Sequence, residues 1–272
     1  MNTAPPLRCP SGVMRSCTFW RETRPGLTAI CLLVLAGLLT SAPTFPAQAQ
    51  DETKELRVVT RMLPPIILTD QGELSGFGID LWNAIAEQMQ VRTAFNVAAD
   101  VGALLERVRS RKADLGVAAV SITPARAREF DFSEPILSGG LQIMVRGEDA
   151  AQIKGPEDLR RRRVATTRQS TSAAFLRDIK ARVYSFAVIK HAYSALLDKK
   201  VDAIVFDAPV LLNYADYTGK GHVQMVGPLF RKEDYGIVFP RNSPLRKQVN
   251  DALSGLRKDG TYQKLYDRWF TN

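Results

Sequence analysis

The segment DLGVAAVSITPARAREFDFSEP, residues 114–135, joins an unbroken apolar run to a helix start that carries a cation. The apolar run at 115–120 is typical of a strand in a sheet that is covered on both faces. Thr123 followed by Pro124 predicts a helix N-terminus, because threonine caps free amides and proline suits the first helical position. Arg126 then lies in the first turn, where a cation is unfavourable unless an anion joins it. The segment therefore indicates an α/β sheet with a polar site at a strand end.

Arg126 has two interpretations. Ligands of open α/β sheets bind in the crevice beyond the carboxyl ends of the strands, and a guanidinium there can hold a carboxylate with two hydrogen bonds. Ser121, at the end of the apolar run, would add a hydroxyl. In the alternative, Arg126 pairs with Glu129 or another acid on the surface. The spacing by itself does not separate a ligand contact from a surface ion pair.

A second segment, VDAIVFDAP at residues 201–209, repeats the pattern of aspartate, apolar strand and proline-bearing turn, and places Asp207 at the matching strand end. Arg126 and Asp207 on opposite sides of a cleft would complement a zwitterion, the arginine holding its carboxylate and the aspartate its ammonium. Between them, Ser170 and Thr171 precede a helix whose free amides attract anions. Ordinary helix capping is the alternative for Asp207 and for the two hydroxyl residues.

Strand-like and helix-like segments alternate along the rest of the chain. The strand-like segments are LRVVT, DLGVAAV, RVATT, YSFAVI and VDAIVFD, and the helix-like ones include GIDLWNAIAEQM, ALLERVRSRK, SAAFLRDIKA, HAYSALLDKK and YQKLYDRWF. Alternation at this spacing predicts an α/β protein with mostly parallel sheets. The repeated pattern in the two halves predicts two similar lobes rather than one large sheet.

The first fifty residues have the pattern of a secretory signal peptide. Four arginines precede the apolar stretch LTAICLLVLAGLL, and small residues lead up to Ala49, so we expect residues 1–49 to be removed. A retained anchor is the weaker alternative, because a spanning helix needs ~20 apolar residues. All three cysteines lie in this segment, so the exported chain would have no thiol for a disulfide, a metal or a nucleophile.

The net charge suggests a nucleic-acid partner, and its distribution argues against one. The whole chain has a formal charge of +9, and the expected mature chain has +6, from 33 basic and 27 acidic residues. The densest basic cluster, LRRRRV at residues 159–164, has no aromatic residue among its cations. Nucleic-acid sites combine a basic face with groups that stack on bases or enter a groove. We therefore expect this cluster to be a solvated face, with no nucleic-acid partner.

From residue 54 onwards, the chain resembles the family 3 periplasmic solute-binding proteins, the polar amino-acid receptors of ABC importers, whose fold is shared with the ligand-binding domain of ionotropic glutamate receptors. The matching segments, in chain order, are GELSGFGIDLWNAIAEQM, ADLGVAAVSITPARAREFDFSEP, RVATTRQSTSAAFL, VDAIVFDAP, YGIVFP and LRKDGTYQKLYDRWF. The resemblance implies a two-lobed periplasmic-binding-protein-like fold of type II. It also implies lobe 1 at residues 51–140 plus 240–272, lobe 2 at 144–236, and hinge strands near 138–144 and 235–240.

The resemblance also implies roles for the candidate site residues. Arg126 resembles the arginine that binds the ligand carboxylate, with Ser121 and the Ala119 backbone beside it and Thr123 at the same helix start. Ser170 and Thr171 resemble residues of the second lobe that contact the anionic end of the ligand. Asp207 resembles the acid that receives the α-amino group.

Two positions depart from the family pattern. Family members often carry an aromatic residue after the Pro-Pro pair, where this chain has Ile66, so Phe77 or Met62 would have to stack on the ligand. The residue after the first strand, acidic in some amino-acid binders, is Arg61 here. If Arg61 faces inward, it favours a ligand with a second negative charge, such as a dicarboxylic amino acid, and on the surface it would have no such role.

The expected function is therefore a monomeric periplasmic receptor that binds an amino acid or related organic acid and delivers it to an ABC transporter permease, without cofactor, metal or catalysis. One alternative is an enzyme on the same fold, similar to cyclohexadienyl dehydratases, which needs a general acid or base. Glu134 is the best acid candidate, while His191 and His222 read as surface residues. The other alternative is a periplasmic sensor module that signals through a partner.

Overall fold

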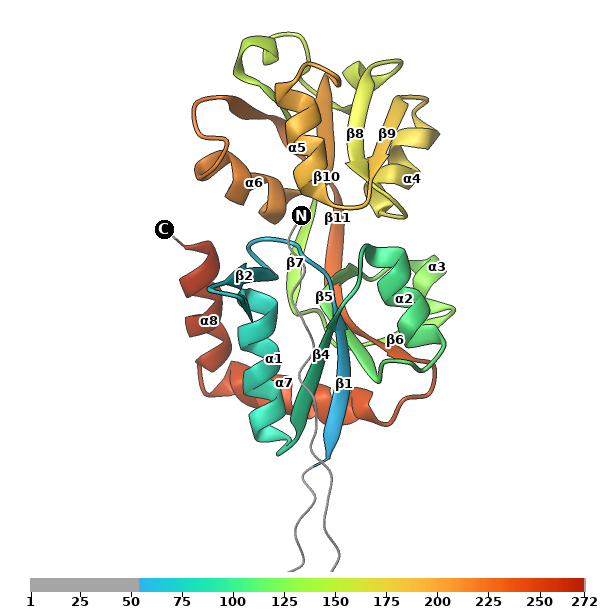
Figure 1. The fold of residues 1–272 in the computed structure, drawn as a ribbon, viewed down its shortest axis with the longest axis vertical. Coiled ribbons are helices and arrows are strands. Elements are labelled where there is room, and N and C mark those ends of the chain that lie inside the picture. The colour runs from blue at the N-terminus through green and yellow to red at the C-terminus, as the bar shows by residue number, and fades with distance from the viewer. Residues whose placement is uncertain (1–53, 272) are drawn as a thin grey trace, which may run out of the picture. The chain divides into compact units, whose positions relative to one another are not determined.

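The computed structural model describes residues 54–271. The predicted signal peptide, its cleavage after Ala49 and its three cysteines lie outside these residues. None of the helices between residues 54 and 271 combines the length and the apolar character that a membrane span requires. The described chain forms two lobes of mixed α/β structure, which confirms the predicted fold class (Figure 1).

The lower lobe in Figure 1 contains the amino-terminal and carboxy-terminal elements. Its strands are β1 (Glu55–Thr60), β2 (Leu68–Asp70), β3 (Glu73–Ser75), β4 (Arg92–Val97), β5 (Leu115–Ser121) and β6 (Phe130–Phe132). Its helices are α1 (Phe77–Gln88), α2 (Val101–Arg109), α3 (Pro124–Ala127), α7 (Leu245–Lys258) and α8 (Thr261–Phe270). We refer to it as lobe 1. Strands β1, β4 and β5 are parallel, as predicted for this part of the chain.

The upper lobe, lobe 2, is built from the middle of the chain (Figure 1). It contains β8 (Arg163–Thr167), α4 (Thr171–Asp178), β9 (Arg182–Phe186), α5 (Ile189–Leu197), β10 (Ala203–Asp207), α6 (Ala208–Asp216) and the short 3-10 helices Gly147–Asp149 and Pro156–Leu159. Strands β8, β9 and β10 are parallel to their neighbours in this group. The strand–helix alternation predicted for this half is confirmed.

Two long strands run through both lobes, β7 (Leu137–Arg146) and β11 (Val223–Pro240). Strand β11 is antiparallel to β5 and β6 in lobe 1 and to β7, which in turn is antiparallel to β10 in lobe 2. The result is one sheet of nine strands with the order β4-β1-β5-β11-β7-β10-β8-β9, and β6 paired with β11. The two lobes were predicted correctly, whereas the expectation of separate sheets was wrong, because β7 and β11 carry main-chain hydrogen bonds from one lobe into the other.

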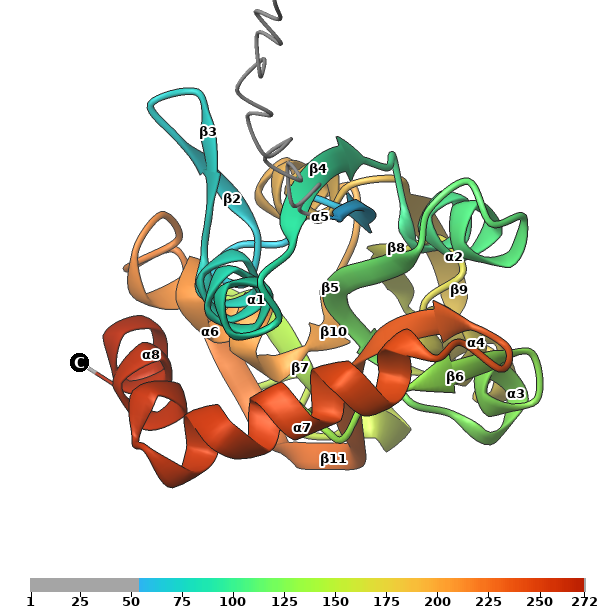
Figure 2. The same cartoon turned by 90° about the horizontal axis from the view of Figure 1, so that it is seen from below.

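Alternate residues of the buried strands pack into different cores. In β1, Val58 packs into the core that contains α1, and Val59 packs into the core that contains α2. Figure 2 shows these two helices on opposite sides of β5, all seven residues of which are buried. Apolar coverage on both faces explains the unbroken apolar sequence of this strand. The strand ends, where coverage stops, are the places left for polar side chains.

The helix start after β5 has the predicted cap. The Thr123 hydroxyl accepts a hydrogen bond of 3.2 Å from the Arg126 amide, and Pro124 is the first residue of α3. This helix ends after only four residues. Its main effect is thus to turn the chain at the end of β5 and to hold the side chain of Arg126 near that strand end.

Candidate ligand-binding site

A small cavity lies where the carboxyl ends of strands from both lobes meet. The open space among its lining residues is about 230 Å³, with the solvent at its mouth included. It is lined by Arg61, Val101, Ala119, Val120, Ser121, Arg126, Ser170, Thr171 and Asp207. Seven of these nine residues are predicted site residues. The cavity therefore suits a small polar ligand.

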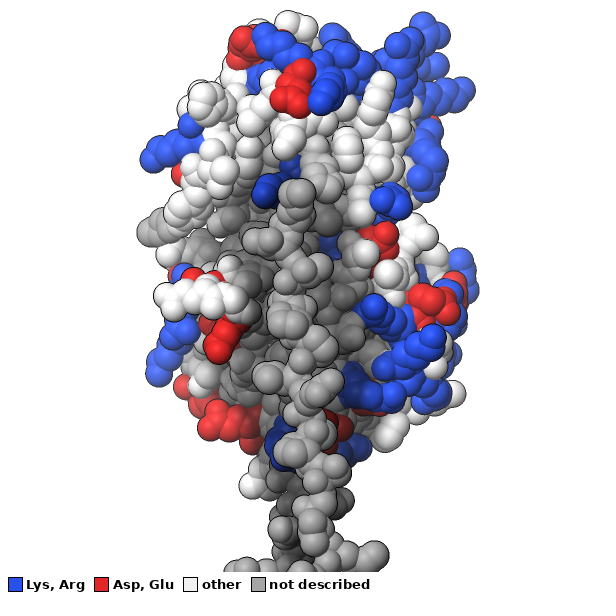
Figure 3. Space-filling view, viewed as in Figure 1, with Lys and Arg blue, Asp and Glu red and all other residues white. Residues whose placement is uncertain are grey.

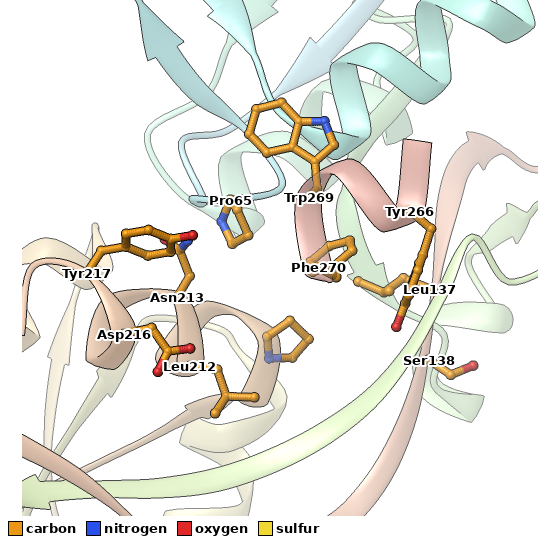
Figure 4. A pocket seen from close by; sticks show the side chains of 11 residues that line it. Pro65, Leu137, Ser138, Leu212, Asn213, Asp216, Tyr217, Tyr266, Trp269 and Phe270 are labelled. Atoms are coloured by element: carbon orange, nitrogen blue, oxygen red, sulfur yellow. The ribbon is translucent and has the colours of Figure 1, made fainter. Parts of the chain in front are cut away.

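A larger hollow lies between α6 and α8 and has a different character. Figure 4 shows Trp269, Tyr266 and Phe270 of α8 on one side, with Leu212 and Asp216 of α6 on the other. None of the eleven residues that line it is a lysine or arginine, and none is a predicted site residue. A carboxylate would find no cation there, so the small cavity is the candidate site.

Arg126 is held at the cavity by main-chain oxygens. Its Nη1 donates to the Ser121 carbonyl at 2.9 Å, and its Nη2 donates to the Gln169 carbonyl of lobe 2 at 3.3 Å. Burial lowers the pKa of Arg126, and the nearby acids Asp207 and Glu233 oppose this shift. The surface alternative does not apply, because Glu129 pairs with a different residue, Arg109.

Arg61 follows β1 directly and lines the same cavity. Arg61 is only 7% exposed, and its Nε is buried with no hydrogen-bond partner among the described residues. Among residues 54–271, its guanidinium makes neither a hydrogen bond nor an ion pair. Burial lowers the pKa of Arg61 to about 10, with Asp207 favouring the charged form and Arg126 opposing it. The inward orientation of Arg61, left open by the sequence, is thus the one in the structure.

Asp207 ends β10 and faces the cavity from lobe 2. It occupies the N-cap position of α6, yet its side chain makes no capping hydrogen bond. Instead, the Tyr235 hydroxyl donates to Asp207 Oδ1 at 3.2 Å. Burial raises the pKa of Asp207 to about 6, and the charge of Arg61 opposes this rise. The capping alternative therefore does not explain this carboxylate.

Ser170 and Thr171 lie at the start of α4, on the lobe 2 side. Ser170 is the N-cap: its hydroxyl accepts from the Ala173 amide at 3.1 Å and donates to the Thr167 carbonyl at 2.7 Å. The Thr171 hydroxyl donates to Glu233 Oε2 at 2.9 Å. Capping thus accounts for the hydroxyl of Ser170, although both residues also line the cavity.

Two predicted contacts lie away from the cavity. The Thr123 hydroxyl is used as the cap of α3, so it faces the helix rather than a ligand. Phe77 is fully buried and packs edge-on against Tyr262 and Phe270 of α8, with ring centroids 6.1 and 5.1 Å away. Met62, the other residue considered for stacking on the ligand, packs against the same core. The nine lining residues include no aromatic side chain, so this cavity has no stacking platform.

The sequence analysis missed three neighbours of the site. Glu233 and Tyr235 point to the same side of β11, and Glu233 is 8% exposed, with Oε1 buried and without a hydrogen-bond partner. The period-two pattern of a strand would have paired these two residues, but the charged run RKED around them hid the strand. The side-chain amide of Gln169 lies so close to Gly102 of α2 that a Cβ on this glycine would overlap it, and the Gln169 carbonyl accepts from Arg126 Nη2. Lobe 1 and lobe 2 are therefore in contact around the cavity.

The densest basic cluster lies elsewhere. Arg160 and Arg161 are exposed just before β8, at the end of that strand remote from the cavity. Figure 3 shows lysine and arginine side chains gathered over the outer end of lobe 2. The cluster is a solvated face, as the sequence indicated, and takes no part in the cavity.

Residues 56–272 match the model of a protein family described as bacterial extracellular solute-binding proteins, family 3. The chain belongs to this family. One relative is the amino-acid-binding protein AabA of Dichelobacter nodosus, which is 28% identical over 82% of this chain and 90% of that protein. The family assignment makes the protein a solute receptor of the extracellular class, and the predicted family is confirmed.

Solved structures agree with this assignment to family 3. The ligand-binding core of the glutamate receptor GluR0 from Nostoc punctiforme, in complex with L-glutamate, is 48% identical, with a TM-score of 0.76 over 80% of this chain and 100% of that one. An ancestral amino acid-binding protein, described as a precursor of cyclohexadienyl dehydratase, is 31% identical, with a TM-score of 0.73 over 80% of this chain and 95% of that one.

The acid–base candidates weighed for an enzyme do not line the cavity of this solute-binding protein. Glu134, His191 and His222 are all exposed and are absent from the nine lining residues. The titratable group inside the cavity with a pKa near neutrality is Asp207.

Proposed function

We propose that this protein is a receptor for a free L-α-amino acid, which it binds in the small cavity and delivers to an ABC importer. Arg126 would bind the α-carboxylate and Asp207 the α-ammonium. The observation that carries the proposal is a guanidinium of lobe 1 and a carboxylate of lobe 2 at one cavity of about 230 Å³. The relatives named above as amino-acid binders support the same ligand class.

The mechanism that we propose is closure of the two lobes on the ligand. Lobe 1 would comprise residues 51–140 plus 240–272 and lobe 2 residues 144–236, with bending near 138–144 and 235–240. Because Arg126 and Asp207 come from different lobes, the closed form alone would hold both ends of a zwitterion, and binding would shift the equilibrium towards it. The exported monomer would present this closed form to the permease in the periplasm.

The test is isothermal titration calorimetry on the purified protein, after a thermal-shift screen of the common L-amino acids, organic acids and prephenate-like compounds. We expect one amino-acid site per chain. Arg126→Met and Asp207→Asn should each weaken binding by roughly 30-fold or more, because truncating one partner of a buried charge pair costs ~2–5 kcal/mol. Arg57→Met is the matched control, since Arg57 forms an exposed ion pair with Asp114. Binding that survives both cavity substitutions would contradict the proposal.

One observation favours an enzyme as the second candidate: the pKa of about 6 for Asp207 suits a general acid or base near neutral pH. Incubation with cyclic acids of the prephenate type, followed by chromatography of the products, separates the two functions. We expect binding of an amino acid and no new product. Product formation that is lost in Asp207→Asn would establish the enzyme instead.

A further inference from the structure

We propose that the ligand carries a second anionic group, as a dicarboxylic amino acid does, and that Arg61 binds this group. The inference rests on the proposed function, because it assigns the side-chain end of an amino acid whose other end Arg126 and Asp207 hold. It makes Arg61 the residue that determines ligand specificity.

The first reason is the isolation of the Arg61 guanidinium inside the protein. More than nine-tenths of the residue is buried, and its Nε has no hydrogen-bond partner within residues 54–271. A buried charged group without a partner is strongly destabilising, and buried cations in proteins are therefore paired. With a pKa of about 10, Arg61 remains a cation at neutral pH. A ligand anion in the adjoining cavity would supply the missing partner.

The second reason is that neither nearby acid makes a short contact with the Arg61 guanidinium among the described residues. Asp100 caps α2 by accepting from the Ala103 amide at 2.9 Å. Asp207 accepts from Tyr235, and no ion pair joins it to Arg61 among the described residues. Each acid contributes to the field at Arg61, but neither provides the short contacts that a guanidinium needs. The carboxylate of Asp207 remains available for an ammonium group.

The third reason is the balance of charge around the cavity. Its lining contains two cations, Arg61 and Arg126, against one anion, Asp207. Glu233 lies behind Thr171 and does not line the cavity, and its Oε1 is 3.8 Å from Arg231 Nε. A neutral zwitterion would leave one buried positive charge uncompensated, whereas an amino acid with two carboxylates and one ammonium would leave none.

The fourth reason is geometric. Arg61 follows β1, and β1 pairs with β5, whose end residue Ser121 holds Arg126 through its carbonyl. The two guanidiniums therefore belong to the same lobe and flank one cavity wall, and Asp207 faces it from the other lobe. Three charged groups in this arrangement match a ligand with three charged groups. A bidentate contact with Arg126 would already involve both oxygens of one α-carboxylate.

The experiment compares acids with their amides, which have nearly the same shape. Calorimetric titrations of the wild-type protein with L-glutamate, L-aspartate, L-glutamine and L-asparagine should show one acid binding roughly 10- to 100-fold more tightly than its amide, the range for a hydrogen bond to a charged group. Arg61→Gln should remove this preference, weakening the acid and leaving the amide within about threefold. Arg61→Lys should retain part of the preference, because the charge persists without the planar fork.

The controls separate this inference from the proposed function. Arg126→Gln should weaken acid and amide alike, and circular dichroism with thermal unfolding confirms that each variant folds. Amides that bind the wild type as tightly as acids would overturn the inference while leaving the amino-acid receptor intact. Equal losses for acid and amide in Arg61→Gln would overturn it too, because Arg61 would then hold the α-carboxylate. If no amino acid binds the wild-type protein, the proposed function itself fails.

Discussion

Arg61 and Arg146 are both largely buried arginines, and they lie in different regions of the molecule. Arg146, at the end of β7 in lobe 2, has a side chain that is 11% exposed. Its Nη1 donates to the carbonyls of Leu196 and Val201, both at 2.7 Å, and its Nη2 pairs with Asp149. Arg61, just after β1, has no such contact with the part of the chain that the structure describes. Each has a buried Nε without a hydrogen bond, so the difference lies in the terminal nitrogens.

The contrast separates an arginine that stabilises the fold from one that is available to a ligand. Arg146 ties the end of β7 to α5 and to the chain that follows it, and every element it contacts belongs to lobe 2. Burial of Arg61 costs the fold free energy, and only the charges of nearby acids such as Asp207 offset part of that cost, without a hydrogen bond or ion pair among the described residues. Binding sites commonly keep such unfavourable groups, because substitutions that relieve them tend to remove function.

The largest expected effect is that of Arg146→Met. Removing this guanidinium leaves Asp149 and two carbonyls without their partner, so the free energy of unfolding should fall by about 3–5 kcal/mol. Urea denaturation followed by circular dichroism measures the change. Lys199→Met is the control, since Lys199 forms an exposed ion pair with Glu148 of a kind that contributes at most ~1 kcal/mol. Similar values for the two variants would erase the distinction drawn above.

The next effect is the pH dependence of stability, which arises from Asp207 and is modified by the charge of Arg61. Burial raises the pKa of Asp207 to about 6, Glu233 adds to the rise, and Arg61, Tyr235 and Arg126 oppose it. The folded state thus binds the proton more tightly than the unfolded state does. The stability of the unliganded protein should therefore fall by roughly 3 kcal/mol as the pH rises from about 4 to above 6.

Amino-acid affinity should change in the opposite direction, rising through the same interval, because the ammonium group requires the ionised carboxylate. Titration calorimetry of amino-acid binding between pH 5 and pH 8 measures this rise in affinity.

In Asp207→Asn, the dependence of stability on pH over this interval should flatten. In Arg61→Met, the midpoint should move to higher pH, since a cation that favours the ionised form is gone. A midpoint that does not move would mean that Arg61 and Asp207 are electrostatically independent.

Arg61→Met should change the free energy of unfolding by less than Arg146→Met, and in the opposite direction. Replacing an unpaired buried cation with an apolar side chain should raise the free energy of unfolding of the unliganded protein by about 1–3 kcal/mol. Urea denaturation at pH 4, below the Asp207 transition, measures this term with the carboxyl protonated in the folded wild type and variant, so that no attraction between Arg61 and Asp207 contributes. A loss of stability as large as that of Arg146→Met would show that Arg61 is a structural residue.

The smallest effect is expected at Tyr235, which holds the carboxylate opposite Arg61. Tyr235→Phe removes the 3.2 Å hydrogen bond to Asp207 and leaves the packing of the ring. A hydrogen bond of this kind contributes about 1 kcal/mol, so amino-acid affinity should weaken about fivefold. The preference for acids over amides should stay unchanged, because Arg61 is not touched. A change in that preference would couple the two ends of the site.

The sequence predicted the two-lobed α/β fold and most of the cavity lining, and the reason is local. Arg126 and Asp207 each follow an apolar strand, and the carboxyl ends of such strands meet at one crevice. Phe77 was considered for stacking only because the family's aromatic residue is missing, and the sequence does not show that α8 covers its ring. The sequence left the orientation of Arg61 open, because the alternation of side chains along a strand does not extend to the residue just beyond it. The continuity of the sheet was hidden by the charged residues of β11.

Strand β11 has 18 residues, and its alternation places Glu233 and Tyr235 on one side and Asp234, bonded to the Ser138 hydroxyl at 2.5 Å, on the other. One residue inserted before Glu233 would reverse all three side chains at once. Thr171 would lose its acceptor and Asp207 its donor, with no change in any residue that lines the cavity. Insertions and deletions in this strand should therefore be rarer in natural variation than substitutions at the cavity itself, because a substitution alters one contact and a register shift alters the whole site.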